Sequence, residues 1–102
     1  ADPRAVDVEA QAAVVAEAFA DGGVRVGFNR ATSRDLARQV LLATAKLLET
    51  SGPADIKDEV ASAGGTAITG VKALEQHGLR YALIEAIEAA SERAAQLSQE
   101  DD

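Results

Sequence analysis

The chain has 102 residues and a formal net charge of −7, a length that holds one small domain and leaves no room for a separate cofactor domain. This acidic balance would repel the phosphate backbone of DNA or RNA, so we expect no nucleic-acid partner. Cysteine is absent, which excludes disulfides and thiolate metal sites and fits the cytoplasm. The longest apolar stretch, residues 40–48, is interrupted by Thr44 and Lys46, so we expect a soluble chain with no membrane contact.

The apolar side chains are numerous but small. Apolar residues make up 47% of the sequence, whereas aromatic residues make up 3%, and Trp and Met are absent. Alanine supplies much of the apolar fraction, and a buried alanine removes far less area from water than leucine or phenylalanine. At roughly 25 cal/mol per Å², the core of a lone chain is thin for its size. This shortage predicts that a partner surface completes the core.

The first predicted helix covers residues 3–20. Asp2 and Pro3 suit its start, because aspartate accepts hydrogen bonds from unpaired amides and proline at the first position has no donor to lose. Its apolar side chains recur at helical spacing: Val8, Ala12, Val15 and Phe19. Gly22 and Gly23 predict its end, and residues 24–28 are then an apolar connector.

The second predicted helix starts at Asn29 or Thr32 and reaches about residue 50. Thr32 and Asp35 have the spacing of a weak capping box. The apolar positions lie in two neighbouring stripes: Leu36, Val40, Ala43 and Leu47, then Ala37, Leu41, Thr44 and Leu48. This arc is too wide for one neighbour, and so short a chain has few elements to cover it. We therefore expect a second subunit to cover this helix.

Three further helices are predicted over residues 54–61, 66–77 and 79–99. Gly52 and Pro53 precede the first of them, Thr66 is the expected N-cap of the second, and Gly78 separates the last two. The last helix carries the spacing of a helix-pairing seam: Leu83, Ile87, Ala90, Ala94 and Leu97. Residues 98–102 form an acidic tail that we expect to fray. Since no segment has strand periodicity, the predicted fold is all-α, with about five helices, two of them long, in one domain over residues 1–102.

Several motifs then follow in an order typical of one family. Residues 17–24 read EAFADGGV, residues 27–30 read GFNR, and residues 56–70 read IKDEVASAGGTAITG. The last run is similar to the signature Leu-Lys-Asp-x-Val-x-Ser-Pro-Gly-Gly-Thr-Thr-Ile-x-Gly of the pyrroline-5-carboxylate reductases. Residues 14–97 as a whole resemble the C-terminal dimerisation domain of that family.

The resemblance implies an intercalated helical homodimer, with larger oligomers left open. It also implies a role in proline biosynthesis, in which the glycine-rich loop holds the carboxylate of a cyclic imino acid against the nicotinamide of a separate Rossmann domain that binds NAD(P)H. No strand followed by G-x-G-x-x-G exists in these residues, so we expect no cofactor in this chain and no hydride transfer by it alone.

Two residues depart from the family's signature. Ala63 replaces its proline, and Ala67 replaces its second threonine, whose hydroxyl is implied to contact the substrate nitrogen. An alanine methyl cannot donate that hydrogen bond. The departures leave three hypotheses open: a dimerisation domain, the substrate-binding half of a working reductase, or a diverged or engineered helical adaptor without activity.

The candidate site residues form two sets, and none of them is assigned to catalysis or to a metal. Ser62, Gly64, Gly65 and Thr66 are the expected substrate-binding residues, because glycine amides at a helix N-terminus favour a carboxylate, although the same residues also suit an ordinary turn. The expected dimer interface contains ten residues: Leu36, Val40, Leu41, Ala43, Leu47, Leu48, Ile68, Leu83, Ile87 and Ala90.

Charged and titratable residues receive structural interpretations. His77, the single histidine, has no histidine or cysteine partner for a metal site, and its place at a helix end suits a structural role. The glutamates of the last helix, Glu85, Glu88 and Glu92, are expected to face solvent. Arg30, Arg34 and Arg38 line one side of the second helix, where they could pair with acids across a dimer.

Overall fold

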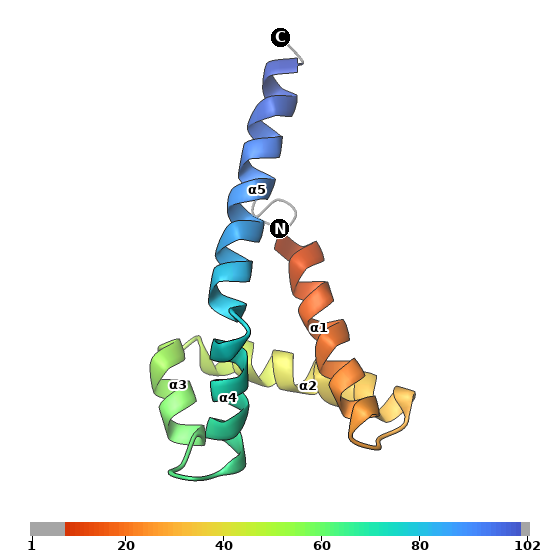
Figure 1. Ribbon diagram of the computed structural model, residues 1–102, viewed down its shortest axis with the longest axis vertical. Coiled ribbons are helices and arrows are strands. Elements are labelled where there is room, and N and C mark those ends of the chain that lie inside the picture. Colours follow the sequence, from red (N-terminus) through yellow and green to blue (C-terminus); the bar gives the residue numbers. More distant parts are fainter. Residues whose placement is uncertain (1–7, 101–102) are drawn as a thin grey trace. The chain divides into compact units, whose positions relative to one another are not determined.

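The computed structural model describes residues 8–100, and within that range every regular element is a helix. Five helices follow one another: α1 (Val8–Arg25), α2 (Arg30–Leu47), α3 (Pro53–Val60), α4 (Thr66–Gln76) and α5 (Leu79–Glu100) (Figure 1). The predicted all-α class and helix number are confirmed. The predicted start of the first helix at Asp2 and Pro3 lies outside the described residues. Of the expected tail, residues 98–100 continue α5 rather than fray.

None of the described helices combines the length and the apolar character needed to cross a membrane. The chain forms two compact units, the first holding α1 to α3 and the second holding α4 and α5.

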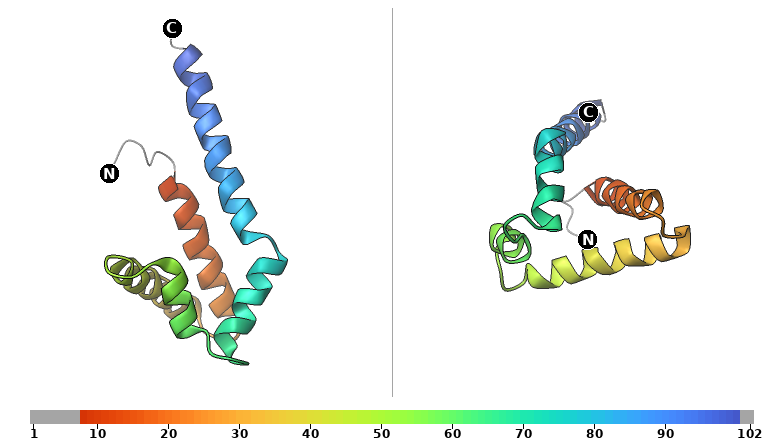
Figure 2. Two further views of the ribbon diagram at one scale, coloured as in Figure 1. Left: turned by 90° about the vertical axis from the view of Figure 1, so that its left-hand side faces the viewer. Right: turned by 60° about the horizontal axis from the view of Figure 1, so that its bottom comes forward.

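In the first unit, α2 crosses α1 near the C-terminal end of α1 (Figures 1 and 2). Three small side chains are buried at the crossing: Ala20 of α1, and Ser33 and Ala37 of α2. Gly23 lies directly against Ser33, since a Cβ atom built on Gly23 would sit 2.6 Å from the Ser33 Oγ. That hydroxyl has no hydrogen-bond partner within residues 8–100, and the Gly23 Cα–H aimed at it makes at best a weak Cα–H···O contact.

The end of α1 differs from the prediction. The helix runs through Gly22 and Gly23 to Arg25, because the contact of Gly23 with α2 offsets the low helix propensity of glycine. The helix ends instead with a Schellman motif, in which the Phe28 amide donates to the Gly23 carbonyl at 3.0 Å and the Gly27 amide to the Val24 carbonyl at 3.1 Å. Gly27 has φ +116°, a left-handed value that other residues rarely adopt.

The start of α2 resolves the choice between two caps. Asn29 is the N-cap, and its Oδ1 accepts the Thr32 amide at 2.8 Å. Thr32 is already helical, so the predicted capping box of Thr32 with Asp35 is wrong. The helix ends at Leu47, earlier than expected, because its last residues tighten into i to i+3 hydrogen bonds, such as that from the Thr50 amide to the Leu47 carbonyl at 3.1 Å.

The second unit consists of two helices that follow each other almost end to end. Gly65, not the predicted Thr66, is the N-cap of α4, because Gly65 has extended dihedral angles while Thr66 is already helical. Gly78 separates α4 from α5, as predicted. In both views of this unit, α5 extends away from the end of α4 rather than folding back beside it (Figures 1 and 2). Its flanks are therefore left uncovered by α4.

Among residues 8–100, fully buried side chains occur only at the α1–α2 crossing. Among the described residues the buried hydrophobic side chains are Ala20 and Ala37, whereas Phe28 is 52% exposed, Val40 53% and Ile84 62%. Full burial of one large apolar side chain is worth about 1.5–3 kcal/mol, and alanine is worth much less. The predicted shortage of core is therefore present in the structure.

We expect Gly23→Ala to destabilise the protein and Gly22→Ala to stabilise it. The Gly23 methyl would overlap the Ser33 side chain, which costs about 1–3 kcal/mol and outweighs the gain in helix propensity. Nothing lies within 4 Å of a Cβ on Gly22, so alanine there gains about 0.5–1 kcal/mol. Urea unfolding followed by circular dichroism, at one protein concentration, measures the free energy of unfolding of both variants. Equal effects of the two substitutions on that free energy would contradict the close contact between Gly23 and Ser33.

We also expect Asn29→Ala to lower the free energy of unfolding by about 0.5–2 kcal/mol, because the Thr32 amide loses its acceptor. Thr32→Ala is the matched control, since the cap uses its backbone amide and not its hydroxyl. It should change stability by less than about 0.5 kcal/mol. If Thr32→Ala lowers the free energy of unfolding more than Asn29→Ala does in the same urea experiment, Thr32 and not Asn29 is the cap of α2.

Candidate functional site

One side of the α1–α2 crossing is an uncharged apolar surface. Large side chains from α1, the α1–α2 turn and α2 surround a hollow of about 220 Å³, which we call the apolar socket: Phe19, Gly23, Phe28, Ser33, Leu36, Ala37 and Val40. The four large members stay well exposed, with Phe19 at 46% and Leu36 at 41%. Exposed apolar side chains gathered around a hollow are typical of a protein-binding surface.

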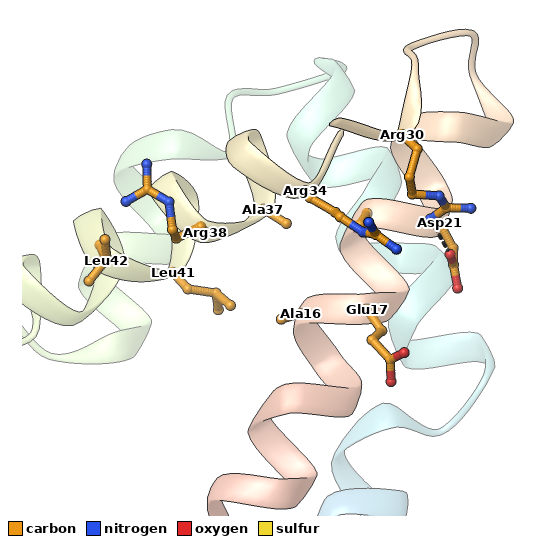
Figure 3. Close-up of a pocket in the computed structure, with 10 residues that line it drawn as sticks. Ala16, Glu17, Asp21, Arg30, Arg34, Ala37, Arg38, Leu41 and Leu42 are labelled. Atoms are coloured by element: carbon orange, nitrogen blue, oxygen red, sulfur yellow. Dashed lines mark hydrogen bonds and ion pairs between the residues drawn. The ribbon is translucent and has the colours of Figure 1, made fainter. Parts of the chain in front are cut away.

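The opposite side of the crossing is charged. A wider, open hollow of about 700 Å³ lies between α1 and α2, and it is lined by both charged and small apolar side chains (Figure 3). The Arg30 guanidinium donates to the Asp21 carboxylate at 2.6 Å and so joins the two helices across one end of the hollow. Glu17 and Arg34 contribute further charge to its walls. Because the Asp21 and Arg30 side chains are 67% and 45% exposed, this pair stabilises the fold by only about 0–1 kcal/mol.

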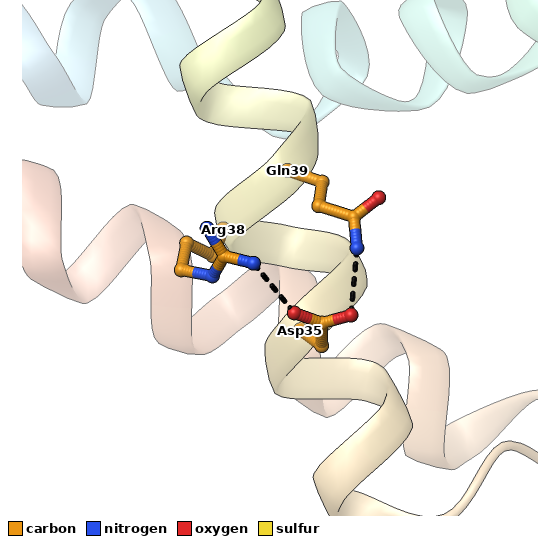
Figure 4. Close-up of polar contacts among 3 residues, drawn as sticks. All are labelled: Asp35, Arg38 and Gln39. Carbon is orange, nitrogen blue, oxygen red and sulfur yellow. Dashed lines mark hydrogen bonds and ion pairs between the residues drawn. The ribbon is translucent and has the colours of Figure 1, made fainter.

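The third side of α2 is hydrophilic. Asp35 accepts a hydrogen bond from Arg38 at 2.7 Å and another from the Gln39 amide at 2.6 Å (Figure 4). The hydrogen bond from Arg38 is the main cause that lowers the pKa of Asp35 below its usual value. The positive charge of Arg38 and the hydrogen bond from Gln39 lower the pKa further, whereas partial desolvation of the carboxylate raises it. This side of α2 is satisfied by its own neighbours, which leaves the socket side as the surface that lacks a cover.

The sequence allows Arg30, Arg34 and Arg38 to pair with acids on another subunit. The structure instead gives Arg30 and Arg38 partners within their own unit, Asp21 and Asp35. Arg34 lines the charged hollow without an ion pair to any residue in the described part of the chain.

The predicted substrate-binding residues lie together in one tight turn before α4. Gly64 has φ +69°, a conformation suited to glycine, and the Gly65 amide donates to the Ser62 carbonyl at 3.1 Å. A Cβ on Gly65 would lie 2.6 Å from the Ser62 Oγ, so no larger residue fits there without movement. Gly65 has no side chain to cap the helix start, and within residues 8–100 no side chain accepts a hydrogen bond from the amides of the first turn of α4. Such amides favour an anion.

The ten predicted interface residues are spread over α2, α4 and α5. Most are exposed, including Ile68 at 38%, Leu83 at 37% and Ile87 at 49%, whereas Leu41 and Ala90 are partly buried. The apolar socket also contains Phe19 and Phe28, which the predicted interface set leaves out. A chemical signal could have found them, because these two are the chain's only phenylalanines, one inside α1 and one in the turn between α1 and α2.

Comparison with known protein families gives a match over nearly the whole chain. The model described as pyrroline-5-carboxylate reductase dimerisation matches residues 8–97. The match includes residues 8–13, which lie outside the stretch whose motifs suggested the resemblance. It covers all of α1 to α4 and most of α5.

Individual relatives agree with the family match. The pyrroline-5-carboxylate reductase of Thermus thermophilus is 51% identical over 89 residues, which cover 87% of this chain and 34% of that protein. The pyrroline-5-carboxylate reductase of Synechocystis is 49% identical over 90 residues, which cover 86% of this chain and 34% of that protein. Pyrroline-5-carboxylate reductase 3 of Danio rerio is 50% identical over 86 residues, which cover 82% of this chain and 30% of that protein. The chain thus spans about a third of the length of these relatives.

A solved structure is also similar. It is the Plasmodium falciparum pyrroline carboxylate reductase with NADP bound, with a TM-score of 0.79, 29% sequence identity, and 83% of this chain and 35% of that chain covered. The residues described here do not fit that nucleotide. A dinucleotide pyrophosphate sits on a glycine-rich turn between a strand and a helix, whereas the glycine-rich turn before α4 follows helix α3, and residues 8–100 contain no strand. We therefore assign no step involving NADP to these residues.

The fold, the uncovered apolar surface and the match over residues 8–97 lead to one conclusion. This chain belongs to the pyrroline-5-carboxylate reductase dimerisation family, whose description implies self-association.

Proposed function

We propose that the chain is a self-association module whose apolar socket side is buried in a homodimer. The observation that carries this proposal is the lack of a core. The buried hydrophobic residues of the described chain are two alanines, while both phenylalanines and most leucines, valines and isoleucines remain partly or fully exposed. A surface of this kind is costly in water and is stabilised when a complementary surface covers it.

The energetics favour a partner. Burying one large apolar side chain contributes about 1.5–3 kcal/mol, whereas association costs an estimated 4–15 kcal/mol in lost freedom of motion. The four large socket side chains are already about half buried, so burying them in both copies offsets only part of that range, and the dimer must cover further apolar surface as well. An isologous dimer uses each surface twice, which suits a single short chain with one apolar side.

The relatives extend the proposal to a biological setting. They are named pyrroline-5-carboxylate reductases, and we propose that this module joins copies of such an enzyme, in proline biosynthesis in the cytoplasm. Dimers could then assemble further. The net charge of −7 argues against a nucleic-acid partner.

We expect Val40→Glu to weaken self-association strongly. The change places a carboxylate in the socket wall, and an unpaired buried charge costs about 3–5 kcal/mol, so the dissociation constant should rise at least about 100-fold. Sedimentation velocity across a dilution series measures it. Gln39→Glu, the neighbouring position on the hydrophilic side of α2, is the matched control and should leave the dimer intact. A wild-type chain that sediments as a monomer at every concentration would refute the module.

We infer a second, separate candidate function for the turn before α4, which is to hold the carboxylate of a cyclic imino acid. The supporting observation is the start of α4, where no side chain caps the helix and a side chain at Gly65 would meet Ser62. Helix N-terminal amides favour carboxylates. Ala67 provides no hydroxyl for the ring nitrogen, so binding should be weaker than a threonine at that position would give.

We expect titration with L-proline, a stable analogue of the cyclic imino acid, to shift the amide NMR signals of Gly64, Gly65 and Thr66. Prolinamide, which lacks the carboxylate, should not shift them. Gly65→Ala should weaken the response, because the Ser62 hydroxyl must move away from the new methyl group, whereas Gly70→Ala, where a Cβ meets nothing within 4 Å, should preserve it. No response to L-proline, or an equal response to prolinamide, would contradict carboxylate binding and favour a helical adaptor that has lost the chemistry.

A further inference from the structure

The charged hollow between α1 and α2 contains one acid and one base that their own helices leave unmatched. Asp21 pairs with Arg30 at 2.6 Å, and Arg38 binds a carboxylate of its own helix at 2.7 Å. Glu17 and Arg34 also line the hollow, and neither forms an ion pair with any residue in the part of the chain that the structure describes. The hollow therefore offers a ligand one negative and one positive charge.

The two unmatched charges lie on facing helices. Glu17 is one helical turn before Asp21 on α1, and Arg34 is one turn after Arg30 on α2, so both stand next to the ion pair that joins the helices. Figure 3 shows the Arg34 side chain extending from α2 toward α1. A guanidinium presents a planar fork of donors that matches a carboxylate, whereas the Glu17 carboxylate accepts hydrogen bonds from an ammonium group. The two walls thus suit ligand groups of opposite charge.

The surface between the charged walls is apolar and made mostly of small side chains. Its members come from both helices: Ala16, Ala20, Ala37, Leu41 and Leu42. Ala20 and Ala37 are buried at the crossing, so they form the floor of the hollow. Its volume of about 700 Å³ lies within the range of about 300–1,000 Å³ that is usual for small-molecule sites. The floor can therefore take a compact apolar group.

We propose that this hollow binds an apolar α-amino acid as a zwitterion. The ligand carboxylate lies on Arg34, its ammonium group on Glu17, and its side chain on the alanine floor. A simple anion would face Glu17, a simple cation would face Arg34, and an uncharged ligand would remove both charges from water without pairing them. A zwitterion pairs both and adds no net charge. The inference is independent of the proposed dimer, which uses the socket on the opposite side of the crossing.

Titration of the full chain with L-leucine, followed by NMR, tests the site. We expect saturable shifts of the Arg34 Nε–H signal and of the Ala20 and Ala37 methyl signals. Three analogues each lack one recognised group: leucinamide has no carboxylate, isocaproate has no ammonium group, and glycine has no apolar side chain. Each analogue should bind about 10- to 100-fold more weakly than L-leucine, because it loses a charge-assisted hydrogen bond or the burial of an apolar side chain.

Substitutions assign the two charged contacts. Glu17→Gln and Arg34→Gln should each weaken L-leucine binding by about 10- to 100-fold. Glu9→Gln and Lys46→Gln are the matched controls, since each removes one charge from the same helices outside the walls of the hollow, and they should leave the affinity unchanged. All four positions are exposed, so the variants should keep the wild-type circular dichroism spectrum.

The other outcomes overturn the proposal. Absence of a saturable response at Arg34 would show that the hollow takes no such ligand. Equal binding of isocaproate and L-leucine would indicate a simple anion site, and equal losses in the control variants would indicate an effect of net charge. A response confined to the amides of Gly64 and Gly65 would place the ligand in the turn before α4 instead.

Discussion

The close approach of Gly23 to Ser33 is the contact on which the first unit depends. It lets α2 cross α1 with only small residues between the two helices, since a Cβ on Gly23 would meet the serine hydroxyl at 2.6 Å. The same closeness limits what the crossing can bury, because Ala20 and Ala37 remove little area from water. The larger side chains are displaced to the flanks of the crossing. A tight helix pair therefore leaves the chain short of core, and the missing burial must come from another surface.

The flanks of the crossing are chemically different, and this difference gives the unit an orientation. Asp21 and Arg30 join the helices on one flank, while Phe19, Phe28, Leu36 and Val40 surround the socket on the other. Asp35, Arg38 and Gln39 satisfy one another along the remaining side of α2. The socket flank carries no charged side chain, and the hydroxyl of its Ser33 is buried at the crossing. A partner that covers this flank would remove the most apolar area from water without burying an unpaired charge.

Much of this fold follows from local sequence rules, and the exceptions have tertiary causes. The helices and the break at Gly78 depend on periodicity and on residues close in sequence, so they could be predicted, while the cap of α2 could be narrowed only to Asn29 or Thr32. The passage of α1 through Gly22 and Gly23 could not, because it depends on contact with Ser33, which belongs to the next helix. Phe28 was missed for the same reason: it belongs to a turn, yet its side chain lies beside residues from both helices. The glycine-rich turn was located correctly as a segment, but its cap was assigned one residue late, at Thr66 instead of Gly65.

The two candidate sites place different demands on the residues that this chain carries. A carboxylate site needs hydrogen-bond donors held in position, and the turn before α4 supplies backbone amides but has Ala63 and Ala67 beside them. A self-association surface needs exposed apolar side chains of sufficient size, and these are present in both units, from Phe19 and Val40 to Ile87. Ala63 and Ala67 remove a ring and a hydroxyl group from the proposed carboxylate site, but they remove no large apolar side chain from the proposed self-association surface. The proposed self-association therefore depends on side chains that are all present, whereas the proposed carboxylate site lacks one of its expected donors, and self-association is the proposal that this sequence supports better.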